Sequence, residues 1–401
     1  MREGLDTVFR GGDGERPRAV LVGIEDGSGD TERMLDELSR LLDTSGGETY
    51  ARLIQAREKP DARTYIGSGK IEELRRLCEA GDAKVALFDA ELSPAQIKNI
   101  EDDLGGDVTV IDRSMLILDI FALHAVTDEG KLQVELAQLQ YSSPRLIGKG
   151  TEMSRQGGGI ASRGPGETKL ETDRRRVRAR MAALRRELDR IERERELRRS
   201  ARKRSGIMTV AIAGYTNAGK STLLNYLTGA GILAEDKLFA TLDPTTRKYA
   251  LPDGTEILLT DTVGFIRKLP HHLVKAFHST LEEITQADAI IALSDASDPE
   301  CGAELEVTVG LLEELGASDK PVLYVFNKCD SADGSLAAAA ADIPSADAIF
   351  ISARTGEGVD ALVSRLGEVA RMGKRRITFH FPASELGCLS ALYGSSTVEE
   401  V

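Results

Sequence analysis

The chain has 401 residues, of which 41 % are hydrophobic and 29 % are charged, and its formal net charge is −13. This composition excludes a wholly disordered chain and is typical of a soluble protein with two or three domains, whereas the acidic balance argues against nucleic-acid binding. No stretch reaches the roughly 18 apolar residues of a membrane span, and the four widely spaced cysteines predict neither a zinc site nor a disulfide framework. We therefore expect a cytoplasmic protein that has no integral membrane association and is monomeric when free.

Residues 1–112 alternate short apolar runs with amphipathic segments. The expected strands are residues 18–24, 85–88 and 108–111, and the expected helices are residues 31–42, a segment that follows residue 70, and a segment that begins at Ser93-Pro94. Ser93 is the expected cap of that last helix, with Pro94 in its first turn. Strands that alternate with helices predict an N-terminal parallel α/β domain.

Residues 113–205 are predicted to form a long antiparallel helical arm. Helical spacing runs from Met115 to about Tyr141, a glycine-rich loop follows at residues 156–166, and a long helix covers about residues 170–200. The apolar side chains of the long helix repeat at heptad-like spacing: Val177, Met181, Leu184, Leu188 and Ile191. This stripe is expected to pack on the first helical segment, with the loop at the tip of the pair.

The α/β alternation resumes at residue 206 and predicts a doubly wound domain over residues 206–371. Its expected strands are residues 208–213, 256–259, 289–293, 322–326 and 348–351. Residues 372–401 contain one strand candidate and one helix candidate, which is material for a short C-terminal α+β lobe. The predicted fold class of the whole chain is α/β.

A phosphate-binding loop follows the first strand of this domain. The pattern G-x-x-x-x-G-K-[ST], placed between a strand and a helix, is matched by Gly214, Tyr215, Thr216, Asn217, Ala218, Gly219, Lys220 and Ser221, with Thr222 next in the helix. In such a loop the backbone N–H groups face the phosphates, Lys220 reaches the β- and γ-oxygens, and Ser221 ligates Mg²⁺.

Three further motifs at strand ends predict that the nucleotide is GTP or GDP. They are Asp261-Thr262-Val263-Gly264, Asn327-Lys328-Cys329-Asp330 and Ser352-Ala353-Arg354. Asp261 can hold Mg²⁺ through water, and the N–H of Gly264 can meet the γ-phosphate. Asp330 can accept two hydrogen bonds that guanine donates and adenine does not, while the third motif closes the base pocket with a backbone N–H.

A candidate switch lies between the phosphate loop and Asp261. It begins with Phe239-Ala240-Thr241-Leu242-Asp243, in which Thr241 is the candidate for a second Mg²⁺ ligand, and Thr245 or Thr246 are the alternatives. A threonine that binds both the metal and the γ-phosphate orders its loop in the triphosphate state and releases it after hydrolysis. We assign Lys220, Thr241 and Gly264 to catalysis, and Ser221 and Thr241 to the metal.

Two positions bear on the rate of hydrolysis. Phe265 follows Gly264, where many GTPases carry a glutamine that orients water, so we expect slow isolated turnover and a water held by backbone, another side chain or a partner. Asn217 matches a pattern of GTPases that bind K⁺ as an additional positive charge, and a local hydrogen bond of the loop is an equally good interpretation.

Beyond the nucleotide motifs, the chain resembles the HflX family of ribosome-associated translational GTPases over most of its length. The matching segments are residues 88–94, 129–137, 154–159, 163–171, 239–243 and 269–283. The resemblance implies a Ras-like P-loop GTPase domain, a metal role for Thr241, binding to the large ribosomal subunit, and splitting of stalled ribosomes. The alternatives are a GTPase of RNA modification or ribosome assembly, and an interaction protein that regulates a membrane protease.

The long helix concentrates positive charge. Residues 174–204 contain 15 basic and 5 acidic side chains, a net charge of +10, which leaves −23 on the rest of the chain. Pairing along the helix neutralises at most five of the basic residues, so the alternative of a solvated, internally paired face accounts for only part of the charge. We expect this helix and the glycine-rich loop to contact the backbone of ribosomal RNA.

Overall fold

The structure of the protein is a computed structural model. It describes residues 16–27, 29–144, 165–229, 231, 238–239, 242–267, 270, 278–332, 348–372, 378 and 380. Ala240, Thr241, residues 156–164 of the glycine-rich loop and nearly all of the expected C-terminal lobe lie outside the described residues.

The first half of the molecule is built on a four-stranded parallel sheet. The strands are β1 (Arg18–Glu25), β2 (Glu48–Ala56), β3 (Val85–Phe88) and β4 (Thr109–Asp112), in the order β2-β1-β3-β4. The helices that connect them are α1 (Thr31–Thr44), α2 (Ser68–Gly81) and α3 (Pro94–Leu104). Ser93 caps α3 as predicted, because its side chain accepts a hydrogen bond of 3.2 Å from Gln96 N while the Gln96 side chain accepts one of 3.0 Å from Ser93 N.

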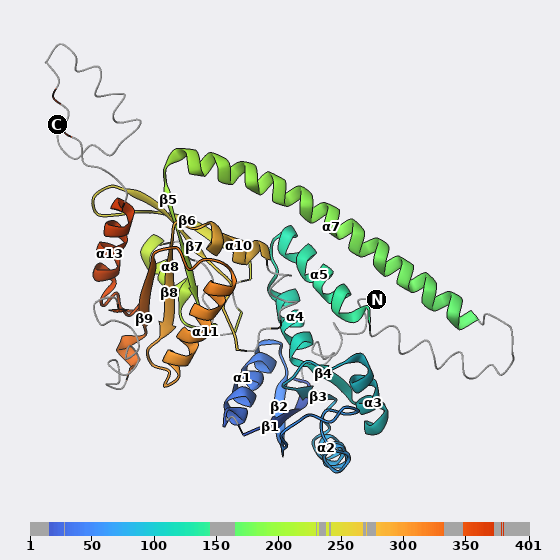
Figure 1. The fold of residues 1–401 in the computed structure, drawn as a ribbon. Coiled ribbons are helices and arrows are strands. Elements are labelled where there is room, and N and C mark those ends of the chain that lie inside the picture. Colours follow the sequence, from blue (N-terminus) through green and yellow to red (C-terminus); the bar gives the residue numbers. More distant parts are fainter. Residues whose placement is uncertain are drawn as a thin grey trace.

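The helical region contains α4 (Arg113–His124), α5 (Asp128–Ser142) and α7 (Pro165–Ser205). The sequence predicted one continuous segment from Met115 to Tyr141, but the helix ends at His124 and restarts at Asp128, since the Thr127 side chain caps α5 by accepting a hydrogen bond of 3.0 Å from Gly130 N. In Figure 1, α7 runs beside α5. The pairs Arg180–Glu135 and Arg195–Glu129 show that the two helices are antiparallel, as predicted.

The second half carries a six-stranded sheet in the order β10-β9-β8-β5-β7-β6. Its strands are β5 (Met208–Gly214), β6 (Thr245–Ala250), β7 (Glu256–Asp261), β8 (Ala289–Asp295), β9 (Val322–Asn327) and β10 (Ala348–Phe350), and only β6 is antiparallel to its neighbour. Its described helices are α8 (Lys220–Thr228), α10 (His278–Gln286), α11 (Cys301–Glu314) and α13 (Val359–Arg371), and a 3-10 turn covers Cys329–Ser331. The predicted α/β class is confirmed.

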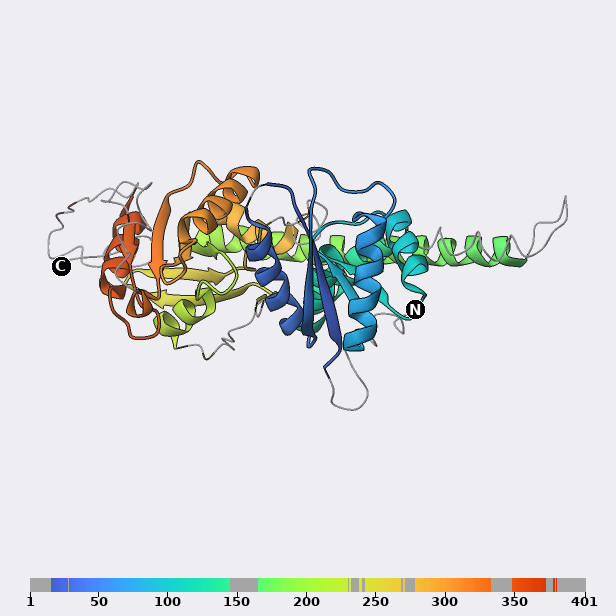
Figure 2. The same cartoon turned by 90° about the horizontal axis from the view of Figure 1, so that it is seen from below.

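Side chains of β5 alternate between two cores, as a strand with helices on both faces requires. Val210 and Ile212 pack with α8 and α13, whereas Ala211 and Ala213 pack with α10 and α11. The second of these cores also contains Leu35 of α1 and other side chains of α1 and α4 from the first half. Helices α1 and α4 therefore lie between the two sheets, and Figure 2 shows α1 beside the second half.

Within the part of the chain that the structure describes, no helix combines the length and apolar character needed to cross a membrane. The longest helix, α7, is rich in arginine and glutamate.

Candidate nucleotide-binding site

The four predicted motifs meet at one edge of the second sheet. They follow β5, β7, β9 and β10, four parallel strands whose carboxyl ends share that edge. Ligands of open α/β sheets bind at such an edge. The structure therefore brings together the motifs that the sequence predicted separately.

The phosphate loop connects Gly214 at the end of β5 to Lys220 at the start of α8. Gly219 has a φ of +95°, and a Cβ there would lie 2.2 Å from Nδ2 of Asn327, so only glycine fits. Lys220 is 7 % exposed, and its Nζ donates hydrogen bonds of 3.1 Å to Gly214 O and 2.8 Å to Tyr215 O. Burial lowers the pKa of Lys220 to about 8, which is a free-energy cost that phosphate oxygens would offset.

The hydroxyl of Ser221 and the carboxylate of Asp261 lie together at the start of α8 and are suited to a hard cation. Ser221 Oγ donates a hydrogen bond of 2.6 Å to Oδ2 of Asp261, whose side chain is fully buried at the end of β7. A hydroxyl and a carboxylate in this position are ligands that Mg²⁺ prefers. Of the alternatives to Thr241, Thr246 has its hydroxyl 3.0 Å from that of Thr260, within the pair β6 and β7.

The backbone of Gly264 and Phe265 runs against the phosphate loop. Phe265 N donates to Gly214 O at 3.0 Å, and Phe265 O accepts from Thr216 N at 2.8 Å. A Cβ on Gly264 would lie 2.7 Å from Cγ2 of Thr216 and 3.0 Å from Nζ of Lys220. The Phe265 ring is 1 % exposed and is part of the core between the two sheets, so it cannot orient a water molecule.

Asn327 holds the base-recognition segments to the phosphate loop. Its Nδ2 donates to Ala218 O at 2.8 Å, and its Oδ1 accepts from Ala353 N at 2.8 Å. Asp330 accepts a hydrogen bond from Arg354. A hydrogen bond from Ser352 and the charge of Arg354 lower the pKa of Asp330, so its carboxylate is ionised and able to accept two hydrogen bonds from guanine.

Two residues of the predicted site direct their side chains to the first half of the molecule. The Tyr215 hydroxyl donates a hydrogen bond to Glu37 of α1. The Asp243 carboxylate accepts hydrogen bonds of 2.8 Å from Val126 N and 2.8 Å from Thr127 N, at the start of α5. Sequence reasoning missed these partners, because nothing local to residue 37 or 127 signals an interaction with chain more than 100 positions away.

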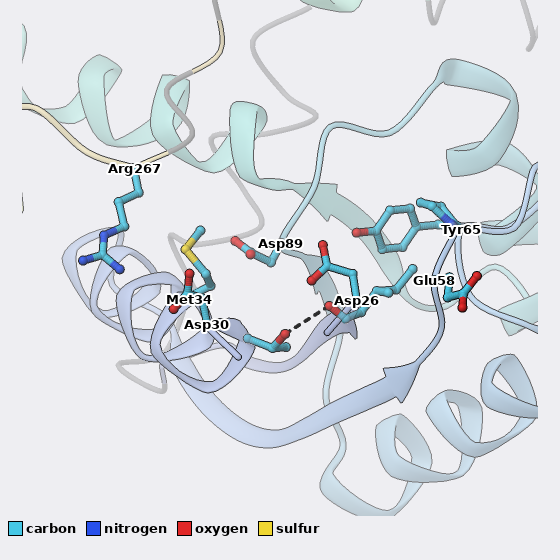
Figure 3. A pocket seen from close by; sticks show the side chains of 10 residues that line it. Asp26, Asp30, Met34, Glu58, Tyr65, Asp89 and Arg267 are labelled. Atoms are coloured by element: carbon cyan, nitrogen blue, oxygen red, sulfur yellow. Dashed lines mark hydrogen bonds between the residues drawn. The ribbon is translucent and has the colours of Figure 1, made fainter. Parts of the chain in front are cut away.

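A cavity of about 310 Å³ lies at the carboxyl ends of β1 and β3 in the first half. Figure 3 shows carboxylates around it, and Arg267 reaches it from the segment that follows Gly264. Its charged lining residues are Asp26, Asp30, Glu58, Asp89 and Arg267. Carboxylates outnumber guanidinium groups in this lining, which makes the cavity less suited to a triphosphate than the phosphate loop at the edge of the second sheet.

A phosphate loop that opens a helix, followed on one sheet edge by an aspartate motif and an Asn-Lys-x-Asp segment, defines a P-loop GTPase. Three family descriptions match the chain in order: "GTP-binding GTPase N-terminal" over residues 32–122, "GTP-binding GTPase Middle Region" over residues 124–202 and "50S ribosome-binding GTPase" over residues 209–328.

The chain belongs to the HflX family of GTPases. It is 50 % identical over 386 residues to GTPase HflX of Lacrimispora saccharolytica, a match that covers 96 % of this chain and 90 % of that relative. It is 42 % identical over 389 residues to GTPase HflX of Escherichia coli strain K12, with the same coverage of 96 % and 90 %. The protein is therefore a GTPase that binds guanine nucleotide and hydrolyses GTP.

A solved structure described as a complex of SsGBP and GDP shares the fold. It aligns with a TM-score of 0.51 at 28 % identity and covers 89 % of this chain and 99 % of that chain. The fold of this chain therefore has a counterpart in a protein whose structure is described as a complex with GDP.

Proposed function

We propose that this GTPase binds the large ribosomal subunit and that its GTP cycle splits or recycles stalled ribosomes. The observation that carries the proposal is the strongly basic surface of α7, on a chain whose GTPase half matches a family described as 50S ribosome-binding. Ribosomal RNA presents a dense array of phosphates, and a basic helix is the expected electrostatic footprint for it.

Two groups of arginines differ in their surroundings among the described side chains of α7. Arg180 forms a bidentate pair with Glu135 at 2.7 Å and 2.7 Å, and Arg195 pairs with Glu129, so these two tie α7 to α5. The others whose side chains are described as exposed are Arg175, Arg176, Arg178, Arg185, Arg186, Arg190 and Arg193. This second group supplies the charge for binding RNA, and the glycine-rich loop 156–166 is proposed to extend it.

In the nucleotide site we propose that Ser221 and Thr241 ligate Mg²⁺ directly, and that Asp261 holds it through water. The hydroxyl and carboxylate of Ser221 and Asp261 already form an oxygen pair 2.6 Å apart. When bound, Mg²⁺ neutralises charge on the β- and γ-phosphate oxygens. Lys220 and the Gly264 N–H stabilise charge on the γ-phosphate from the protein side.

We further propose that Asn217, which has a φ of +64°, turns its side chain to a K⁺ ion beside the phosphates. The chain acts in the cytoplasm as a monomer, with working units at residues 1–112, 113–205, 206–371 and 372–401. Residues 239–247 and 261–286 transmit the nucleotide state to the rest of the molecule.

The test is a titration of GTP turnover with purified large ribosomal subunits at several KCl concentrations. We expect turnover to rise with added subunits, and the subunit concentration needed for half of the effect to increase steeply with salt, as for any interaction dominated by phosphates. Small subunits at the same concentrations are the control. Turnover that stays constant at saturating large subunits would exclude the proposal.

A further inference from the structure

Tyr215, the second residue of the phosphate loop, carries its side chain into the first half of the molecule. Its hydroxyl donates a hydrogen bond to Oε2 of Glu37 on α1, and accepts one of 2.9 Å from Arg267 N. Only 5 % of Tyr215 is exposed. A buried phenol normally finds one partner, whereas this one is fixed by partners from two elements.

Glu37 is itself held by a buried cation. Arg113 of α4 donates hydrogen bonds to Oε1 of Glu37 and, at 2.7 Å, to Oδ1 of Asp89. The side chains of Arg113 and Glu37 are only 3 % and 13 % exposed. Because buried charges are tolerated only when paired and hydrogen-bonded, this network keeps the Glu37 carboxylate in one orientation.

The same network forms hydrogen bonds to the backbone of the segment that follows Gly264. Arg113 donates a hydrogen bond of 3.0 Å to Arg267 O, so both the N–H and the carbonyl of Arg267 are bound, the first by Tyr215 and the second by Arg113. Gly264, three residues earlier, stands against Lys220, since a Cβ on Gly264 would lie 3.0 Å from Lys220 Nζ. A shift of the Arg267 backbone would therefore move Gly264 away from the position where its N–H meets the γ-phosphate.

We propose that Glu37 is a positioning residue for GTP hydrolysis, which acts from the other half of the molecule through Tyr215 and the backbone of Arg267. It does not contact the nucleotide. It fixes the phosphate loop and residues 264–267 relative to each other, so that less reorganisation is needed when charge develops on the γ-phosphate. Glu37 lies outside every nucleotide motif, and its role does not involve the ribosome.

The first test is Tyr215→Phe, which keeps the ring and removes only the hydroxyl. Steady-state GTP hydrolysis without ribosomes should show a kcat lower by about tenfold, the order expected for loss of a hydrogen bond to a charged group. KM for GTP and Kd for GDP should stay within about twofold, because the side chain does not contact the nucleotide.

Glu37→Gln should lower kcat to a similar extent in the wild-type background and by less than about twofold in the Tyr215→Phe background, because the two residues act as one unit. The matched control is Asp36→Asn, the same carboxyl-to-amide change one residue away on α1, where Asp36 pairs with Arg52 at 2.7 Å within the first half. It should leave kcat unchanged.

Three results would overturn the proposal: a kcat of Tyr215→Phe within about twofold of wild type, effects of the two variants that multiply, or a loss of GDP affinity that parallels the loss of kcat. The last result would indicate a merely structural role. Because the assay contains no ribosomes, its outcome is independent of ribosome binding.

Discussion

Lys220 is the buried cation of the phosphate loop. It is buried, and its ammonium group donates to two carbonyls of the loop, which are weaker partners than phosphate oxygens. Burial therefore lowers its pKa from 10.5 to about 8. The Lys220 ammonium group is therefore poorly solvated in the absence of nucleotide, and phosphate oxygens would replace the lost hydration.

This arrangement predicts uptake of a proton when nucleotide binds. Bound phosphates raise the pKa of Lys220 again, so above about pH 8 the protein must protonate Lys220 as GDP binds, and affinity falls as pH rises through that value. Calorimetric titration of GDP at about pH 8.5, in Tris and in EPPS, should give binding enthalpies that differ with the buffer's ionisation enthalpy. Equal enthalpies in the two buffers would show that Lys220 is already protonated.

The site residues that could be predicted from the sequence are those that belong to a contiguous motif. Gly219, Asn327 and Asp330 follow from patterns of eight residues or fewer at strand ends, and the structure places them around one site. Glu37 and Arg113 were not predictable. Glu37 lies 178 positions from Tyr215, and its local surroundings are those of an ordinary amphipathic helix.

At the scale of elements, the strands that the sequence predicted carry apolar runs, and some of them, such as β3 and β8, are buried along nearly their whole length; β10 is a half-buried edge strand, but its sequence AIF is apolar. The two that it missed, β2 and β6, are edge strands. Most of the side chains of β2 are half-buried or exposed, and β6 reads TTRKYA, so neither carries an apolar run. Their pairing depends on neighbouring strands, which a local pattern does not show.

The heptad stripe of α7 is confirmed as the side that α5 covers. Val177 and Leu184 are 3 % and 0 % exposed, while Met181, Leu188 and Ile191 are half-buried. The rest of the helix is polar, so this narrow stripe must supply most of the packing free energy that holds α7 on α5. Truncation of side chains in this stripe should weaken the packing of α7 on α5 and leave the nucleotide site unchanged.

Leu184→Ala should therefore destabilise the packing of α7 on α5 by about 2–4 kcal/mol, the cost of truncating a fully buried leucine. Hydrogen exchange of the α7 amides measures this as faster opening. Leu197→Ala, the same substitution on the same helix at a side chain that is 73 % exposed, should change the free energy of opening by less than about 0.5 kcal/mol. Equal protection of α7 in both variants would mean that the stripe does not hold the arm.

At the scale of the whole molecule, the charge is divided between the basic helix and an acidic remainder. Residues 174–204 carry a net charge of +10 and the rest of the chain carries −23, which together give the net charge of −13. The cavity in the first half is also acidic, because its lining includes Asp26, Asp30, Glu58 and Asp89. An acidic body is repelled by RNA, so in the proposed complex the arm would make the contact with phosphates, and this would restrict docking to orientations that present the arm.

Charge reversal on the arm tests this division. Arg178→Glu with Arg186→Glu changes two exposed side chains of α7, and should weaken stimulation of turnover by large subunits by about tenfold or more while intrinsic turnover stays unchanged. The slope of the logarithm of subunit affinity against the logarithm of salt concentration should also become shallower, by about 0.7–0.9 for each RNA phosphate that the arm no longer neutralises. The control is Arg40→Glu with Arg76→Glu, which removes the same charge from exposed positions of α1 and α2. If both double variants reduced stimulation equally, the net charge of the protein, and not the basic arm, would determine its affinity for the subunit.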